Sequence, residues 1–279
     1  MEPLVVALAG LLAGVNAAGG QWVEDPGKGW SALAVYHHDT RERFGTEGDS
    51  EALSAEGRAV TTSSFLTSAL GLIGGVDLWA QVSFHRLRYD DESAERSSTG
   101  LGDARLWVRA APLKWLGSAL PFAVRAGFKI PVGDFDDVGA DEVPLGDGQR
   151  DWEVMAELGQ SFWPFSVYAS GWVGYRWRED NAESGREFGN ELFYYAQLGG
   201  QSGRVGYKLA VDGYNGSAAS AEGAPSAGFE RDLVQLVPSL LYDVGAGQVQ
   251  AGLRLAMGGK NVTAGTSLVF QYFSKWELF

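Results

Sequence analysis

Residues 76–88 decide the fold, and they read VDLWAQVSFHRLR. As far as Phe84, apolar residues occupy every second position, and the positions between them are polar apart from Trp79. A repeat of two places successive side chains on opposite faces of a β-strand, whereas an amphipathic helix repeats about every 3.6 residues. This stretch is therefore predicted to be a strand with one apolar and one mostly polar face.

The same alternation recurs along the chain. It lies within residues 104–109, 122–130, 151–158, 166–178, 191–198, 205–212 and 249–255. A soluble β-sandwich also alternates, with its apolar face inward. Here the segments approach or exceed about ten residues, the length of a tilted bilayer crossing. Their polar faces repeatedly carry Arg, Lys, Asp and Glu, so we expect an all-β transmembrane barrel with the apolar face toward lipid.

Connections between the segments alternate in length. Short ones are expected at residues 73–75, 112–120, 163–165, 199–203 and 243–247, and long ones at 44–57, 90–99, 132–149, 179–189 and 215–231, with 258–262 intermediate. Outer-membrane barrels combine short periplasmic turns with longer outer loops in this way. Five turns and six loops predict an antiparallel up-and-down barrel of about 12 strands, and an even number closes it without a free edge.

Composition excludes several other classes of protein. The chain has 279 residues, no Cys, and 22 Lys and Arg against 35 Asp and Glu, for a net charge of −13. The absence of Cys excludes disulfides and thiolate metal sites. The negative charge is the wrong sign for binding nucleic acid. An apolar fraction of 45% is too high for a disordered chain. No apolar run reaches the roughly 18 residues of a helical membrane span.

The two ends carry targeting signals of an exported barrel. Residues 4–15 are apolar and small, and Val15-Asn16-Ala17 has small residues at the cleavage positions. Residues 1–17 are therefore predicted to be a cleaved signal peptide, and residues 18–279 a single barrel domain; a buried N-terminal helix is the alternative. The chain ends in Phe279 after an alternating segment, as outer-membrane barrels commonly do, although Phe273 is an alternative end of that signal.

Several short motifs, taken in order, resemble those of a Gram-negative outer-membrane family of proposed transporters named for the meta-pathway of phenol degradation. They are GLGDARL at 100–106, FKIPVGD at 128–134, VPLGDGQRD at 143–151, GYRWR at 174–178 and NEL at 190–192. The resemblance covers residues 30–273 and implies a barrel that passes small molecules, apolar ones included. It implies no catalytic residues. The tail after residue 273 and the acidic insert at 134–142 depart from the family pattern.

Charged residues of the polar faces are expected to line the lumen. They are Arg105, Arg109, Arg125, Lys129, Asp151, Glu153, Glu157, Arg176, Arg178 and Glu191. Because basic strands neighbour an acidic one, cross-strand ion pairs are expected. Two interpretations remain open: the charges line a wet pore and set its ion selectivity, or they pair and plug a narrow barrel. We favour a narrow or constricted channel.

The segment after Ile130 is a candidate constriction loop. Pro131 ends strand pairing because it has no N–H donor, and the following glycines allow a tight fold. The loop would bring acidic residues to the lumen: Asp134, Asp136, Asp137 and Asp147. A structured rim loop is equally compatible with the sequence. The acidic spacing matches no known calcium loop, so no metal or other cofactor is expected.

Catalysis is disfavoured. The chain has three histidines, and His85 follows Ser83 on one strand without any known triad order. The nucleophile-elbow and zinc-protease motifs are both absent from the sequence. We therefore expect a channel or passive transporter in the cell outer membrane. Its expected partners are outer-membrane lipid, lipopolysaccharide and the barrel-assembly machinery, and not nucleic acid. The alternative is a scaffold barrel with a plugged lumen, which would bind proteins of a surface complex.

Overall fold

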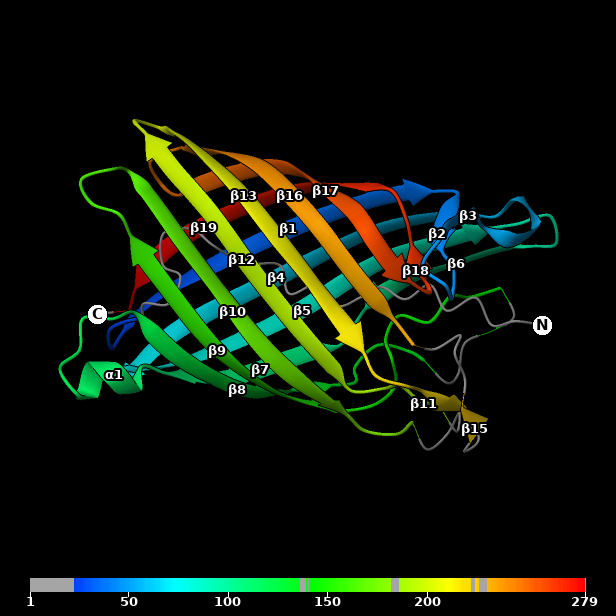
Figure 1. Cartoon of the computed structure of the whole chain (residues 1–279), viewed down its shortest axis with the longest axis horizontal. Helices are drawn as coiled ribbons and strands as arrows, with labels where there is room; N and C mark the ends of the chain where they lie inside the picture. Colours follow the sequence, from blue (N-terminus) through cyan, green and yellow to red (C-terminus); the bar gives the residue numbers. More distant parts are fainter. Residues whose placement is uncertain are drawn as a thin grey trace.

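Long antiparallel strands form the wall of the protein. The computed structural model describes residues 23–135, 139, 141–181, 186–221, 224–225 and 230–278. The wall strands are β1 (Lys28–Thr40), β4 (Arg58–Ile73), β5 (Val76–Asp90), β7 (Ala104–Ala110), β8 (Phe122–Ile130), β9 (Asp151–Ser161), β10 (Val167–Arg178), β12 (Glu191–Ser202), β13 (Val205–Gly216), β16 (Asp232–Asp243), β17 (Gln248–Lys260) and β19 (Thr266–Glu277). They are inclined to the long axis of the molecule (Figure 1).

The sheet closes on itself. Strand β1 pairs with β4 on one side and with β19 on the other, from Lys28 opposite Glu277 to His38 opposite Ser267. Strand β6 (Glu95–Leu101) and β7 pair with successive stretches of the same edge of β5, so together they occupy one position in the wall. The described residues thus form a closed barrel of 12 strands, which confirms the predicted fold class.

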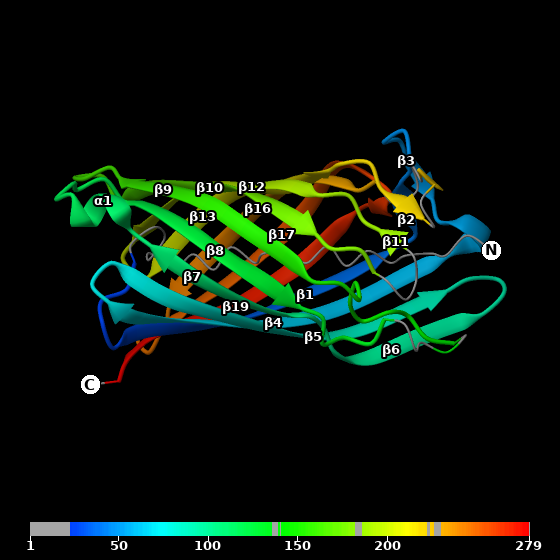
Figure 2. The same cartoon turned by 90° about the horizontal axis from the view of Figure 1, so that it is seen from below.

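The two ends of the barrel differ. Short turns lie at one end, together with α1 (Pro112–Trp115), whereas the longer connections lie at the other (Figures 1 and 2). The long connections contain the short elements β2 (Glu42–Phe44), β3 (Ser50–Ala52), η1 (Ser54–Glu56), β11 (Arg186–Glu187), β14 (Ser220–Ala221), β15 (Ala224–Pro225) and β18 (Val262–Thr263). None of the described helices is long and apolar enough to cross a membrane. The long-loop end is called the outer mouth below.

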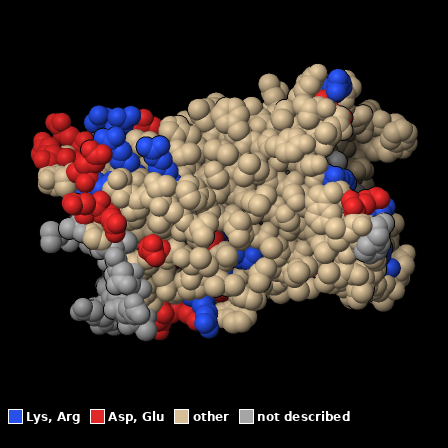
Figure 3. Space-filling view, turned by 180° about the vertical axis from the view of Figure 1, so that it is seen from behind, with Lys and Arg blue, Asp and Glu red and all other residues tan. Residues whose placement is uncertain are grey.

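Side chains alternate between the lumen and the outer surface. In β5, Asp77, Trp79 and Gln81 are buried, whereas Leu78 and Val82 are exposed. The space-filling view shows a wide, mostly uncharged band, with charged residues gathered toward its ends and densest at the loop end (Figure 3). Exposed Leu, Val and Phe side chains over the strands suit contact with lipid. The predicted orientation of the faces is correct.

Several strand boundaries differ from the sequence expectation, and two of them affect how the barrel is built. Residues 90–99 were expected to form a loop. Instead, β6 begins at Glu95 and pairs with the end of β5, so that the two strands form a hairpin that extends beyond the barrel wall. At the C-terminus, Phe273 is buried in the lumen, and the strand continues to Glu277 in register with β1. The residues after Phe273 are therefore part of the closing strand. Residues 1–17 and Phe279 lie outside the described residues.

Candidate functional site

All ten predicted lumen charges point inward and are buried. The pairing of these charges across strands was not anticipated from the sequence. The two basic strands, β7 and β8, lie side by side. Arg105 lies opposite Lys129, and Arg109 lies opposite Arg125, in the β7–β8 pair. Like charges directly opposite one another destabilise a sheet. The carboxylates that compensate them come from the flanking strands β5 and β9 and from a loop, and they form three connected groups.

The group nearest the short turns surrounds Arg109. Its Nη2 lies 2.6 Å from Asp77 Oδ2, and its Nη1 lies 3.3 Å from Glu157 Oε2. Arg125 approaches the same Glu157 carboxylate, with 2.7 Å between Nε and Oε1. The two guanidinium groups lie over the ring of Trp79, 4.6 and 4.4 Å from its centroid. Two arginines are thus held together by two acids and an aromatic ring.

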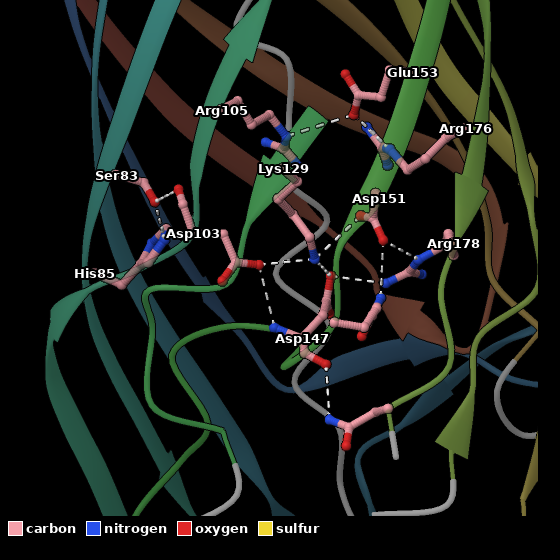
Figure 4. A network of polar contacts seen from close by, with 12 residues as sticks. Ser83, His85, Asp103, Arg105, Lys129, Asp147, Asp151, Glu153, Arg176 and Arg178 are labelled. Atoms are coloured by element: carbon pink, nitrogen blue, oxygen red, sulfur yellow. Dashed lines mark hydrogen bonds and ion pairs between the residues drawn. The ribbon is translucent and has the colours of Figure 1, made fainter. Parts of the chain in front are cut away.

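Glu153 is the centre of the middle group. It accepts hydrogen bonds of 2.8 Å from Trp107 Nε1 and 2.7 Å from Arg176 Nε, and Arg105 Nε lies 3.6 Å away (Figure 4). Arg176 also makes a close ion pair with Glu191. Each charged group of this set is buried, and each has an oppositely charged partner, which offsets the cost of removing it from water.

The third group lies toward the outer mouth, around Lys129. The Nζ atom of Lys129 is 2.9 Å from Asp103, 3.1 Å from Asp147 and 3.2 Å from Asp151 (Figure 4). Arg178 contacts Asp147 at 2.8 Å, Glu191 at 3.1 Å and Asp151 at 3.6 Å. A lysine ammonium with three carboxylates uses all three of its donors.

The charges of the complete network balance. Among the described residues, seven cations meet seven carboxylates. The cations are Arg105, Arg109, Arg125, Lys129, Arg176, Arg178 and Arg231, and the carboxylates are Asp77, Asp103, Asp147, Asp151, Glu153, Glu157 and Glu191. These side chains fill one side of the lumen and leave little of their surface accessible. The geometry favours paired charges on this wall over a wet ladder of free ones.

The loop of residues 131–150 enters the mouth with its second half. Val143 and Leu145 are buried in one cluster with Leu87 and Tyr89 of β5 and with Leu53, which lies between β3 and η1. Leu145 N–H donates to the carbonyl of Asp134, whose own side chain is exposed. Of the predicted constriction residues, Asp147 alone is seen to reach the network, and Asp136 and Asp137 lie outside the described residues.

Asp147 connects the loop to the wall electrostatically. Burial by itself would raise the pKa of its carboxyl, but the charges of Lys129, Arg178 and Arg231 outweigh this effect and hold that pKa well below its usual range. A carboxylate beside several cations is stabilised in its ionised form. Asp147 is therefore ionised at neutral pH and anchors the loop.

The other side of the lumen carries few charges. Its inward residues are mainly amides, hydroxyls and aromatic rings: Ser170, Tyr195, Gln197, Ser239, Gln250 and Gln271. Lys208 Nζ donates to Gln250 at 2.8 Å, and Arg254 donates to Asp212 and Gln235. Nearer the short turns, Trp30 packs edge-on against Trp79 at 4.7 Å and lies 5.7 Å from Phe273. The lumen therefore has one ionic wall and one largely neutral wall.

His85 is part of a small polar cluster away from the ion pairs. Its Nδ1 is 2.9 Å from Ser63 Oγ, and its Nε2 is 3.1 Å from Ser83 Oγ. Both ring nitrogens are therefore engaged by hydroxyls, which is not the serine–histidine–acid order of a hydrolase. Over the ranges that the structure describes, no three His, Asp or Glu residues are placed to hold a metal ion.

A family model matches most of the chain. It is described as "Putative MetA-pathway of phenol degradation" and covers residues 17–272. The chain belongs to this family. The resemblance seen in the sequence motifs is thereby confirmed. No curated protein sequence matches the chain.

Solved structures resemble this member of the phenol-degradation family in fold. An outer membrane channel from Pseudomonas putida F1 is 13% identical, with a TM-score of 0.68, over 94% of this chain and 100% of that one. The translocator domain of the autotransporter NalP from Neisseria meningitidis is 10% identical, with a TM-score of 0.52, over 91% and 90% of the two chains. The β domain of the Bordetella autotransporter BrkA is 11% identical, with a TM-score of 0.51, over 90% and 100%. This family member is an outer-membrane β-barrel.

Several charged residues of the lumen were not predicted as site residues. Asp77 shares the polar face of the first quoted stretch, so its parity could have identified it. Asp103 directly precedes β7 and has the parity of Arg105, so alternation places it on the polar face, whereas Arg231 precedes β16 and is not reached by strand alternation. Lys208, Asp212 and Arg254 belong to alternating strands, and their positions in those strands indicated that they face the lumen.

Proposed function

We propose that this protein is a narrow channel through the outer membrane, for passive passage of small molecules. The closed barrel, membership of the phenol-degradation family and the likeness to an outer membrane channel all support it. We also propose passage rather than catalysis, because the two ring nitrogens of His85 contact the hydroxyls of Ser63 and Ser83 and not a carboxylate.

The close packing of side chains in the lumen supports a narrow channel. Arg109 and Lys129 have no exposed side-chain surface, although both point into the barrel. In a water-filled porin such side chains would be solvated. A 12-stranded barrel lies between small barrels filled by side chains and wide porins with 16 or more strands, so a constricted path fits its size.

Small and partly apolar molecules fit this lumen best. The aromatic side chains of Trp30, Trp79 and Phe273 offer apolar surface near the short turns, while amides and hydroxyls line the neutral wall above them. Apolar pockets with a few placed polar groups are typical of small-molecule sites. The family description, which refers to phenol degradation, supports aromatic compounds as candidates.

Single-channel conductance measurements test the proposed channel. The purified protein, inserted into planar bilayers, should give small discrete steps in potassium chloride. Liposomes that contain it should swell in small solutes and not in trisaccharides. Silent bilayers over many confirmed insertions, together with no swelling in any solute, would contradict a channel.

A scaffold with a plugged lumen is the second candidate function. The observation in its favour is the complete pairing of the ten predicted lumen charges, which leaves none of them free to attract ions. A scaffold would bind surface-complex proteins through its outer loops and would not conduct. Outer-membrane lipid, lipopolysaccharide and the barrel-assembly machinery are proposed partners under either function.

A further inference from the structure

The side chain of Arg231 is buried at the outer mouth and makes no hydrogen bond to the residues that the structure describes. It has 6% of its surface exposed, and its Nε and Nη1 atoms have no partner. Its Nη2 lies 3.9 Å from both Asp147 Oδ1 and Glu191 Oε1, beyond the roughly 2.7–3.2 Å of an N–H···O hydrogen bond. Both carboxylates are already held more closely by Arg178. Buried polar groups are normally hydrogen-bonded, so the guanidinium of Arg231 lacks the hydrogen-bond acceptors that such a group normally has.

Tyr214 offers a second unused donor beside it. The hydroxyl of Tyr214 is buried and has no partner. Gly216 lies opposite Glu191 on one side, and its N–H donates to the carbonyl of Arg231 on the other. Tyr214 is the preceding inward residue of β13, so it is a diagonal neighbour of Arg231, within reach of long side chains. A Cβ atom at Gly216 would lie 2.8 Å from the carbonyl oxygen of Arg231, so the lack of a side chain at Gly216 allows this close approach of the two backbones.

The surroundings of these unused donors define what kind of ligand could bind them. Arg178 and Arg231 lie over the ring of Phe188, 4.6 and 4.8 Å from its centroid, which fixes the position of both guanidinium groups. Tyr214 packs in the same apolar cluster as Phe193 and Leu233. Cationic and hydroxyl donors therefore adjoin an apolar surface. A ligand with an oxyanion would accept hydrogen bonds from these donors, and its apolar body would pack against the apolar surface.

We propose that Arg231 and Tyr214 bind the carboxylate of a small organic acid whose apolar body lies against Phe193 and Leu233. The inference rests on the proposed channel function, since the site would receive the solute at the outer mouth. Arginine presents a planar set of N–H donors that matches a carboxylate, and the tyrosine hydroxyl supplies one further donor.

Calorimetric titration of the refolded full chain in detergent tests the site, with benzoate as the probe and benzyl alcohol as its uncharged counterpart. Benzoate should bind saturably and at least about tenfold more tightly than benzyl alcohol. Arg231→Gln should weaken benzoate binding about tenfold or more, and Tyr214→Phe about threefold to tenfold. The matched control is Arg254→Gln, a buried lumen arginine with its own partners Gln235 and Asp212, which should leave benzoate affinity unchanged.

The outcomes separate this site from the channel itself. Absence of saturable benzoate binding to the wild type, or unchanged affinity in both variants, would overturn the site. Heat-modifiable migration on gels confirms folding of each variant. If Arg231→Gln fails to fold, Tyr214→Phe still tests the site, because it removes only one oxygen atom. Conductance is measured separately: a silent protein that binds benzoate through Arg231 keeps the site and contradicts the channel. A conducting protein that does not bind benzoate does the reverse.

Discussion

Trp107 on β7 donates a 2.8 Å hydrogen bond to Glu153 on β9, across the strand that lies between them. The residue in register with both is Gly127 of β8. A Cβ atom at this position would lie 2.3 Å from Trp107 Cδ1 and 2.2 Å from the carbonyl oxygen of Leu106. The indole can therefore cross β8 because Gly127 has no side chain, and this contact positions the carboxylate that holds Arg176 and Arg105.

Replacing Gly127 with alanine should destabilise the barrel. The added methyl group must displace either the indole or the backbone of β7, and overpacking of this kind costs about 1–3 kcal/mol. The free energy of unfolding, measured by denaturant titration in lipid vesicles, reports this loss. Gly74→Ala is the matched control, because nothing lies within 4 Å of a Cβ there. Equal effects of the two substitutions would show that the crossing is not tightly packed.

The sequence predicts the faces of the strands well, because a face depends only on parity. Asp151, Glu153 and Glu157 were placed inward by alternation and are inward. Which charge meets which depends instead on the register between strands and on side-chain reach. Arg105 and Lys129 are directly opposite like charges, an arrangement that no single-strand pattern indicates. Their acids come diagonally from other strands.

Sequence reasoning missed network residues for two reasons. Asp77 and Asp103 have the parity of polar faces but were not selected as site residues, whereas Arg231 precedes β16 and has no predicted face. The loop that carries Asp147 was predicted to constrict the lumen, but a rim position was equally compatible with its sequence. Lys129 of β8, Arg178 of β10 and Arg231, which precedes β16, together determine the inward position of Asp147, and that meeting point depends on the tertiary structure.

Asp147→Asn should release the constriction loop. The substitution removes the charge that Lys129 and Arg178 contact at 3.1 and 2.8 Å. Hydrogen bonds to charged groups contribute about 1.5–3 kcal/mol, so protease cleavage within the loop should be about tenfold faster or more, and conductance should rise. The control on the same loop is Asp134→Asn, whose side chain is exposed. Identical cleavage rates for the two variants would contradict the anchoring role.

The pH dependence of the same contact has a definite sign. The pKa of Asp147 in the folded protein is held well below the ordinary 3.8. The stabilisation from its ionised form is therefore present above pH 3.8 and is lost only as the pH falls through the lowered pKa. Differences in cleavage between the wild type and Asp147→Asn should persist down to about pH 4. Their disappearance near pH 5–6 would contradict this assignment.

Leu209→Arg should destabilise the protein in lipid. Leu209 is 48% exposed on the outer face of β13, between the inward Lys208 and Ala210. An arginine on the lipid face costs about 2–4 kcal/mol at the bilayer midplane and less near the interfaces. Leu209→Met keeps the apolar surface and should be nearly neutral. Unfolding in vesicles measures the difference, and a loss below about 1 kcal/mol would place this residue outside the hydrocarbon region.

The coupling between Asp77 and Arg109 distinguishes a paired wall from a wet pore. Both side chains are fully buried, and their closest atoms are 2.6 Å apart. A double-mutant cycle with Asp77→Asn and Arg109→Gln should give a coupling energy of about 1–3 kcal/mol that changes little with salt. The exposed pair Lys28 and Glu277, at 3.8 Å, is the reference and should give less than about 1 kcal/mol. If the buried pair behaved like the exposed one, and weakened in high salt, water would have to reach it. The lumen charges would then be free to act on permeating ions, as in the wet-pore interpretation.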